Sequence, residues 1–194
     1  VTTDHISPSG IITPDSEAGQ FLQAQGVAPQ DFNSFGTRRG CSDVVIRSTF
    51  ANYRLQNEMT PGREGSWTRI EPEGTVVTVC KAIETYLARG QSHVVIGGKE
   101  YGCGSSRDTA AKAPWLAGVR AVIAESFERI HRSNLVNMGI APLCFPDGVT
   151  RKTLGLDGRE TFDIDFAPDL RSASLTIHRP DGSTAETPLD LRLY

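Results

Sequence analysis

The chain has 194 residues, which is room for one domain, and its hydrophobic fraction of 38% is enough to close a core and excludes general disorder. Its 20 basic and 23 acidic residues leave a net charge of -3, which argues against a dedicated binder of nucleic acid or of anionic membranes, because such proteins carry a basic excess. No apolar run approaches the ~20 residues that a bilayer span requires, and from the opening residues we expect no signal peptide.

The first forty residues are rich in turns. Between these turns, Ser16 is placed to cap a short helix around Leu22. Residues 44–46 form a short apolar run that predicts a buried strand, and a loop follows it. Apolar residues then recur at helical spacing over residues 78–89, which predicts an amphipathic helix that ends at Gly90.

The middle of the chain alternates between apolar runs and helical segments. In chain order it predicts a strand over 93–97, a loop over 99–107, a helix over 108–116, a strand over 119–124, a helix over 127–138 and a strand over 140–145. Pro114 must bend or stop the first of these helices. Strands and helices in this alternation are typical of an α/β fold with a mainly parallel central sheet and right-handed crossovers.

The remaining residues have a different pattern. Residues 162–166, 175–178 and 189–193 alternate between apolar and polar, and Asp181-Gly182 is typical of a hairpin turn. We therefore expect a C-terminal antiparallel β extension over residues 147–194. It belongs to the same domain, so that residues 1–194 form one unit.

Four cysteines are spread along the chain, without a C-x-x-C pair or a histidine at ligand spacing: Cys41, Cys80, Cys103 and Cys144. A domain of this size closes a core without disulfide staples. We expect reduced, mostly buried thiols in a cytoplasmic protein, and no metal site built from this chain alone.

The segment Tyr101-Gly-Cys-Gly-Ser-Ser-Arg-Asp108 is the strongest local signal. Its glycines let the backbone approach a ligand, and the free N–H groups of the helix that follows suit an anion. Ser105, Ser106 and Arg107 add two hydroxyls and a fork-shaped cation suited to a carboxylate or phosphate. The segment matches neither the Walker pattern nor G-x-G-x-x-G. It predicts an oxyanion-binding loop, and a tight turn with a capping serine is the alternative.

Two further segments allow both a functional and a structural interpretation. In Thr2-Thr-Asp-His-Ile-Ser7, Asp4 could orient a histidine for acid–base work, but a capped turn with a surface histidine also explains the pattern. In Gly36-Thr-Arg-Arg-Gly40, Arg38 and Arg39 form either a solvated basic pair or a carboxylate clamp. A third residue, His131, lies on a predicted helix beside the core. We expect it to be a hydrogen-bonded structural residue, because Leu135 occupies the i+4 position of a zinc pair.

Taken together, these segments resemble the C-terminal domain of the aconitase family. The matching segments are long, follow one order and cover most of residues 1–146, whereas the β-rich tail is less distinctive. They are Thr2-Thr-Asp-His-Ile-Ser-Pro-Ser-Gly10, Asp31-Phe-Asn-Ser-Phe-Gly-Thr-Arg-Arg-Gly40, Ser48-Thr-Phe-Ala-Asn-Tyr-Arg54, Tyr101-Gly-Cys-Gly-Ser-Ser-Arg-Asp108 and Ala121-Val-Ile-Ala-Glu-Ser-Phe-Glu-Arg-Ile-His-Arg-Ser-Asn134.

The resemblance implies the swivelling β/β/α domain of an iron–sulfur hydro-lyase, whose [4Fe–4S] cluster is bound by three cysteines outside this chain. The implied partners are cluster-bearing N-terminal domains, or a separate large subunit, and a tricarboxylate substrate. The opening at Val1, followed at once by a motif, also favours a piece of something longer. We expect the isolated domain to fold but not to catalyse, with no nucleic-acid or membrane partner.

The resemblance also implies roles for individual residues. Ser105 would be the base that removes a proton from carbon, acting as an alkoxide. Ser106 and Arg107 would bind a substrate carboxylate, and Arg39 would contact another. Asp4 would pair with a histidine of a different domain, and Ser7 would lie near the edge of the cluster.

Departures from the family pattern bear on the substrate more than on the reaction type. Thr109 stands where the aconitase branch commonly has Trp, and residues 57–59 and 82–90 look more like 2-methylcitrate dehydratase. Residues 37–40 look like ordinary aconitase, whereas Cys103 and residues 113–115 are similar to the small subunit of isopropylmalate isomerase. We expect isomerisation of citrate to isocitrate via cis-aconitate. The alternatives are another tricarboxylate dehydratase and, in a different class, an RNA-binding regulator, for which the near-neutral charge offers no support.

Overall fold

The computed structural model describes residues 1–105, 107–191 and 193. Its main sheet has six strands in the order β3-β4-β5-β8-β7-β6. Its strands are β3 (His93–Ile96), β4 (Val119–Ala124), β5 (Ala141–Cys144), β6 (Thr161–Phe166), β7 (Ser172–His178) and β8 (Thr184–Leu191). The first three are parallel, and β8, β7 and β6 continue the sheet in antiparallel pairing. The expected parallel strands and the antiparallel tail are therefore confirmed, but they are two halves of one mixed sheet.

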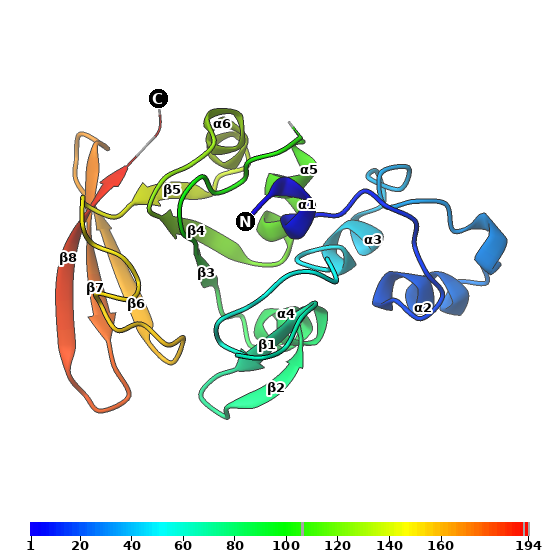
Figure 1. Cartoon of the computed structure of the whole chain (residues 1–194), viewed down its shortest axis with the longest axis horizontal. Helices are drawn as coiled ribbons and strands as arrows, with labels where there is room; N and C mark the ends of the chain where they lie inside the picture. The colour runs from blue at the N-terminus through cyan, green and yellow to red at the C-terminus, as the bar shows by residue number, and fades with distance from the viewer. Residues whose placement is uncertain (106, 192, 194) are drawn as a thin grey trace.

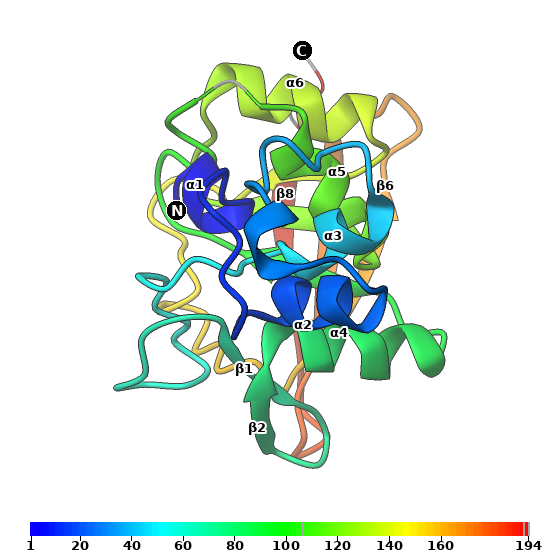
Figure 2. The ribbon, with the colours of Figure 1, turned by 90° about the vertical axis from the view of Figure 1, so that its right-hand side faces the viewer.

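Helices and a small hairpin surround the parallel half. The helices are α1 (Thr3–Ile6), α2 (Glu17–Ala24), α3 (Ser42–Arg47), α4 (Val79–Ala88), α5 (Thr109–Leu116) and α6 (Arg129–Asn137), with a 3₁₀ turn at Pro29–Asp31 and a hairpin of β1 (Trp67–Ile70) and β2 (Thr75–Thr78). Figure 1 shows β6–β8 at one end of the molecule and α2 and α3 at the other. In the turned view of Figure 2, α1, α2, α3 and α5 lie in front of the strands. In the part of the chain that the structure describes, no helix is long and apolar enough to span a bilayer.

Strand β4 is buried on both faces apart from Arg120, as a central parallel strand should be. Ala121 and Ile123 belong to a cluster that continues across β5, β7 and β8. Val122 and Ala124 point to the opposite face and join a second cluster that contains residues of α5 and α6. Because Ile6 of α1 is in this second cluster and fully buried, the N-terminal segment is fixed to the same face as α5.

Residues 44–46 form a helix, so the strand predicted there is wrong. They lie in α3, which begins after Cys41 and buries Val44 and Val45. Val44 packs with Ile12 and Leu22 in a small separate cluster. An apolar run this short does not distinguish strand from helix, and the packing of α2 decides the outcome.

Two other local predictions are confirmed. Ser16 caps α2 and accepts a hydrogen bond from the backbone N–H of Gly19 at 3.0 Å. Helix α4 lies within the predicted residues 78–89 and is followed by Gly90 in the left-handed region.

Pro114 lies inside α5, which continues to Leu116. The β1–β2 hairpin has no counterpart among the predicted elements, since its residues fall in the region expected to be a loop.

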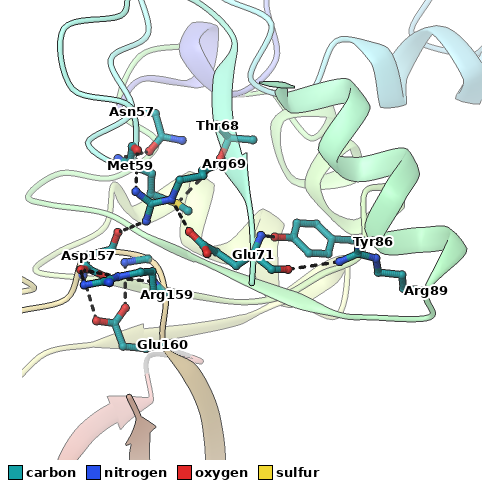
Figure 3. Close-up of polar contacts among 11 residues, drawn as sticks. Asn57, Met59, Thr68, Arg69, Glu71, Tyr86, Arg89, Asp157, Arg159 and Glu160 are labelled. Atoms are coloured by element: carbon teal, nitrogen blue, oxygen red, sulfur yellow. Dashed lines mark hydrogen bonds and ion pairs between the residues drawn. The ribbon is translucent and has the colours of Figure 1, made fainter. Parts of the chain in front are cut away.

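A polar network ties the β1–β2 hairpin and α4 to the loop before β6 (Figure 3). Arg69 of β1 pairs with Glu71 and donates to the backbone oxygen of Asp157 at 3.2 Å. Tyr86 of α4 accepts a hydrogen bond from the Glu71 N–H at 2.9 Å. Glu160 accepts two backbone N–H bonds from the same loop, at 3.1 and 2.9 Å. These contacts connect segments that the hydrophobic clusters leave apart.

Candidate functional site

A pocket of about 270 Å³ opens where the segment after α1, the turn before Arg39, α3 and the start of α5 meet. It brings together three residues that the sequence singles out, namely Ser7, Arg39 and Arg107. Its full lining is Ser7, Pro8, Ser9, Phe35, Gly36, Arg39, Val44, Val45, Ser48, Arg107, Asp108 and Thr109. The pocket therefore combines two guanidinium groups with hydroxyls and a short apolar wall.

Arg107 is held at the wall of this pocket from two sides. Its Nη1 donates to the backbone oxygen of Ser7 at 3.1 Å, and its Nη2 lies 3.3 Å from Asp4 Oδ1. The side chain is 23% exposed, and its Nε is buried without a partner among the described residues. A planar guanidinium suits such a divided role, because its five donors diverge in a fixed fork.

Helix α1 begins with a capping box, which confirms the capped-turn interpretation of this segment. The Thr2 side chain accepts from the His5 N–H, and His5 Nδ1 is 3.1 Å from the Thr2 nitrogen and 2.9 Å from its hydroxyl. Asp4 therefore does not orient the histidine next to it. Its carboxylate instead faces Arg107 on Oδ1 and receives a hydrogen bond from Asn52 at 2.9 Å on Oδ2.

The loop that carries Ser105 is anchored to two distant segments. On one side the Tyr101 N–H donates to the backbone oxygen of Ser126 at 2.9 Å. On the other side the Gly102 N–H donates to the Val1 oxygen at 2.8 Å, and the Thr3 N–H donates to the Cys103 oxygen at 2.9 Å. The backbone of the loop is thus fixed immediately before Ser105.

Glycine at positions 102 and 104 is required by the backbone, since Gly102 has φ +81° and Gly104 has φ +115°. Ser105 follows them and is exposed, and it is not among the residues that line the pocket. Ser106 lies outside the described residues. Helix α5 begins at Thr109 with Asp108 as its cap residue, and the Asp108 side chain makes no cap hydrogen bond among the described residues.

The structure gives Arg38 and Arg39 different environments. Arg38 donates to the backbone oxygens of Phe32 and Asp31, both at 2.8 Å, and so holds the preceding turn. Arg39 is exposed, lines the pocket and donates to the Gly36 oxygen at 2.9 Å. Neither the solvated pair nor the buried clamp describes both residues. One arginine is structural, and the other is available at the pocket.

Two residues of the site have no predicted role, although both lie in a segment that carries the family resemblance. Asn52 is 8% exposed and binds Asp4, as described above. Ser48 is 2% exposed, donates to the Val45 oxygen at 2.6 Å and lies 3.4 Å from the Ser7 hydroxyl. The signal that could have identified them is their position as polar residues in a short motif, because polar groups that become buried need hydrogen-bond partners.

His131 is buried, but the predicted hydrogen bonds are wrong. Neither ring nitrogen has a partner among the described residues, and the ring packs against Tyr101 with centroids 5.5 Å apart. Burial lowers the pKa of His131 to about 4, because the imidazolium cannot be solvated there. The residue is therefore a neutral part of the core beneath the 101–105 loop.

The described residues do not supply a cage for a metal cluster. No group of three or more His, Cys, Asp or Glu side chains among them could hold a metal ion. None of the four cysteines is in a disulfide; Cys80 and Cys144 are buried, and Cys41 and Cys103 are half-buried. A cluster held by cysteines outside this chain therefore stays a proposal.

Comparison with known proteins decides the family. A family model described as the aconitase C-terminal domain matches residues 18–148. The chain belongs to this family. It is 56% identical over 196 residues to aconitate hydratase A of Escherichia coli, and 51% identical over 205 residues to the enzyme of the same name from Thermus thermophilus, and both alignments cover the whole chain.

The chain spans 22% and 23% of the lengths of these two relatives. Among solved structures, a 3-isopropylmalate dehydratase from Methanocaldococcus jannaschii is similar with a TM-score of 0.37 and 23% identity, over 58% of this chain and 61% of that chain. A score this low carries no argument about the site. The aconitase-family membership rests on the sequence matches alone.

Proposed function

We propose that this chain is the swivelling C-terminal domain of an aconitase-like hydratase that isomerises citrate to isocitrate through cis-aconitate. The observation that carries the proposal is the pocket in which Arg39, Arg107 and Ser7 converge from three separate segments. The names of the relatives, aconitate hydratase A, support citrate as the substrate over 2-methylcitrate or another tricarboxylate.

In this proposal Arg107 and Arg39 bind two of the substrate carboxylates. Each carboxylate that leaves water must be paired, and a bidentate guanidinium does so with little reorganisation. Arg107 is already restrained by the Ser7 oxygen and by Asp4, so its position costs little to hold. Arg39 is exposed and can turn toward the substrate. Ser106 is proposed to add a hydroxyl to the same carboxylate as Arg107.

Ser105 is proposed as the base. As an alkoxide it accepts a proton from the substrate carbon, while the neighbouring carbon loses hydroxide. The leaving hydroxide takes a proton from a histidine of a different domain, which is proposed to pair with Asp4, so that water and cis-aconitate are formed. Rehydration on the other carbon is the same step in reverse and returns the proton from Ser105. A serine anion needs preorganised positive charge. The left-handed Gly104 that precedes Ser105 and the cation of Arg107 that follows it are suited to supply this environment.

The remaining parts of the site are proposed to come from elsewhere in the complete enzyme. Asp4 is 54% exposed, which leaves it accessible to a histidine of a different domain. Ser7 would lie near the edge of a [4Fe–4S] cluster held by cysteines outside this chain. The partners are then cluster-bearing N-terminal domains or a large subunit. The isolated domain is expected to be inactive, and the complete enzyme is expected to be cytoplasmic.

The test is the variant Ser105→Ala in the complete enzyme, assayed with citrate, cis-aconitate and 2-methylcitrate. We expect turnover to collapse while the absorption spectrum of the cluster stays intact. Ser133→Ala on the exposed side of α6 is the matched control and should keep normal activity. Normal activity of the Ser105 variant would overturn the assignment of the base, and turnover of 2-methylcitrate in preference to citrate would overturn the substrate.

A further inference from the structure

Asn52 lies in the loop that follows α3, and both ends of its side-chain amide make hydrogen bonds. Its Nδ2 donates to Asp4 Oδ2 at 2.9 Å and lies 3.1 Å from the Asp4 backbone oxygen. Its Oδ1 accepts from the Arg54 N–H at 2.8 Å. Because a backbone N–H can only donate, the oxygen must face Arg54 and the NH₂ group must face Asp4. The amide is therefore fixed in one orientation.

Asp4 divides its carboxylate between two partners. Oδ2 is bound by Asn52, and Oδ1 faces the Arg107 guanidinium at 3.3 Å. Arg107 in turn lines the substrate pocket. A continuous path of polar contacts thus leads from the buried amide of Asn52, through Asp4, to the cation at the pocket wall.

We propose that Asn52 is a positioning residue of this site, which holds the Asp4 carboxylate, and through it the Arg107 guanidinium, in the orientation that receives a substrate carboxylate. The proposal rests on the function proposed above for Arg107 and Asp4. It assigns Asn52 no contact with the substrate.

Asp4 needs a further restraint because its side chain is exposed to solvent. The Asp4 side chain is 54% exposed and stands on a helix of only four residues, and an exposed ion pair alone restrains its long side chains weakly. Asn52 is 8% exposed and its amide is fixed on both sides, so the buried amide orders the part of the carboxylate that it contacts. Two other side chains near this pair are engaged elsewhere, since the His5 ring contacts Thr2 and the Arg54 guanidinium lies over the Tyr53 ring at 5.2 Å.

The sharpest variant is Asn52→Asp in the complete enzyme. It keeps the oxygen that accepts from the Arg54 N–H, replaces the donor to Asp4 with an acceptor, and adds a like charge. Asn57→Asp is a matched control. Asn57 also accepts a hydrogen bond from a backbone N–H two residues on, that of Met59 at 3.1 Å, and its Nδ2 donates to the Trp67 backbone oxygen at 3.1 Å. Among the described residues it makes no hydrogen bond to a carboxylate.

We expect Asn52→Asp to lower kcat/KM for citrate by about tenfold or more, the size associated with a hydrogen bond to a charged group. Two adjacent carboxylates ionise less readily than one, so the acid limb of the pH profile of kcat/KM should also move to higher pH. Asn57→Asp should show neither effect. The proposal is overturned if the two variants have the same kcat/KM and the same pH profile.

A second variant keeps the proposal testable if Asn52→Asp does not fold. Asn52→Ser retains an acceptor for the Arg54 N–H and adds no charge. It should lower kcat/KM without moving the acid limb. In an Arg107→Lys background it should change kcat/KM by less than about twofold, because residues that act through one another are not additive. If the losses in kcat/KM caused by Asn52→Ser and Arg107→Lys are fully additive, Asn52 does not act through Arg107.

The outcomes separate this inference from the proposed function. If the unsubstituted enzyme does not convert citrate or cis-aconitate, the proposed function fails. If the unsubstituted enzyme is active and Arg107→Lys impairs it, but both Asn52 variants equal the Asn57 control, then only the positioning role fails.

Discussion

The ring of His131 lies directly against Gly102, so that a Cβ on residue 102 would fall 2.1 Å from His131 Cδ2. Gly102 also has φ +81°, in the left-handed region. Helix α6 and the loop that carries Ser105 are thus in contact at a point that tolerates no side chain. The position of the loop depends on both residues.

Gly102→Ala should destabilise the protein and impair the site. The left-handed backbone costs roughly 1–2 kcal/mol for a residue with a Cβ, and overpacking against the buried ring adds about 1–3 kcal/mol. Gly26→Ala is the control, because Gly26 has φ +80° but nothing within 4 Å of the added Cβ. Urea denaturation should show the larger loss for Gly102→Ala. Equal losses would mean that the contact with His131 contributes nothing.

Stability should fall as the pH is lowered from about 6.5 to about 4. Burial lowers the pKa of both His93 and His131 from 6.5 to about 4. In that window the unfolded chain binds a proton at each histidine and the folded chain does not, so the free energy of unfolding decreases as pH falls. The effect could reach about 3 kcal/mol per histidine, at about 1.4 kcal/mol for each pH unit.

His131→Phe tests this assignment, since it keeps an aromatic ring but removes the titrating group. The free energy of unfolding of the variant, measured by urea denaturation between pH 7 and pH 4, should fall less steeply than that of the unsubstituted protein. His93 should account for the histidine-dependent fall that remains. Identical slopes for the two proteins would show that His131 does not titrate in this window.

Arg107→Ala in the complete enzyme should weaken binding of the transition state by on the order of 2–5 kcal/mol, by analogy with other buried charge pairs. Arg107→Lys should recover only part of this, because an ammonium cannot reproduce the fork that reaches Ser7 and Asp4 together. Steady-state kinetics with citrate give the comparison. Arg54→Ala, which removes an exposed guanidinium over Tyr53, should stay close to the unsubstituted enzyme.

The cysteines should differ in their reactivity toward iodoacetamide. Burial raises the pKa of Cys80 to about 12, which leaves almost no thiolate at neutral pH. Cys144 is also buried, whereas Cys41 and Cys103 are partly accessible. Mass spectrometry of the native protein should show labelling at Cys41 and Cys103 first. Early labelling of Cys80 would indicate that α4 opens in solution.

Elements specified by local chemistry were predictable from the sequence. Ser16 caps α2, and strand β4 begins and ends at the predicted residues. Where local signals were weak, prediction failed. The apolar residues 44–46 became a helix because α2 offers them a surface, and the β1–β2 hairpin is secured by contacts from Arg69 to residues far along the chain.

The residues of the candidate site also fall into two groups, those that the sequence identifies and those whose role only the structure reveals. Arg39, Arg107 and Ser7 were identified from motifs, and the structure places all three on one pocket. Asn52 lies within a motif that assigns it no role, because its partner Asp4 is 48 positions away. The partners of an amide depend on how α1 packs beside the loop after α3, and no local pattern contains that information.

The sequence by itself determined the family, the alternating strands and helices, and the glycines at positions 102 and 104, because each depends on residues close together in the chain. Only the tertiary structure decided that Asp4 meets Arg107 across 103 positions, that β8 joins the tail to β5, and that His131 is buried without hydrogen bonds to the described residues. The physical reason is that these contacts form when the hydrophobic clusters pack on the two faces of β4. Burial of apolar surface then brings polar groups together that no sequence window contains.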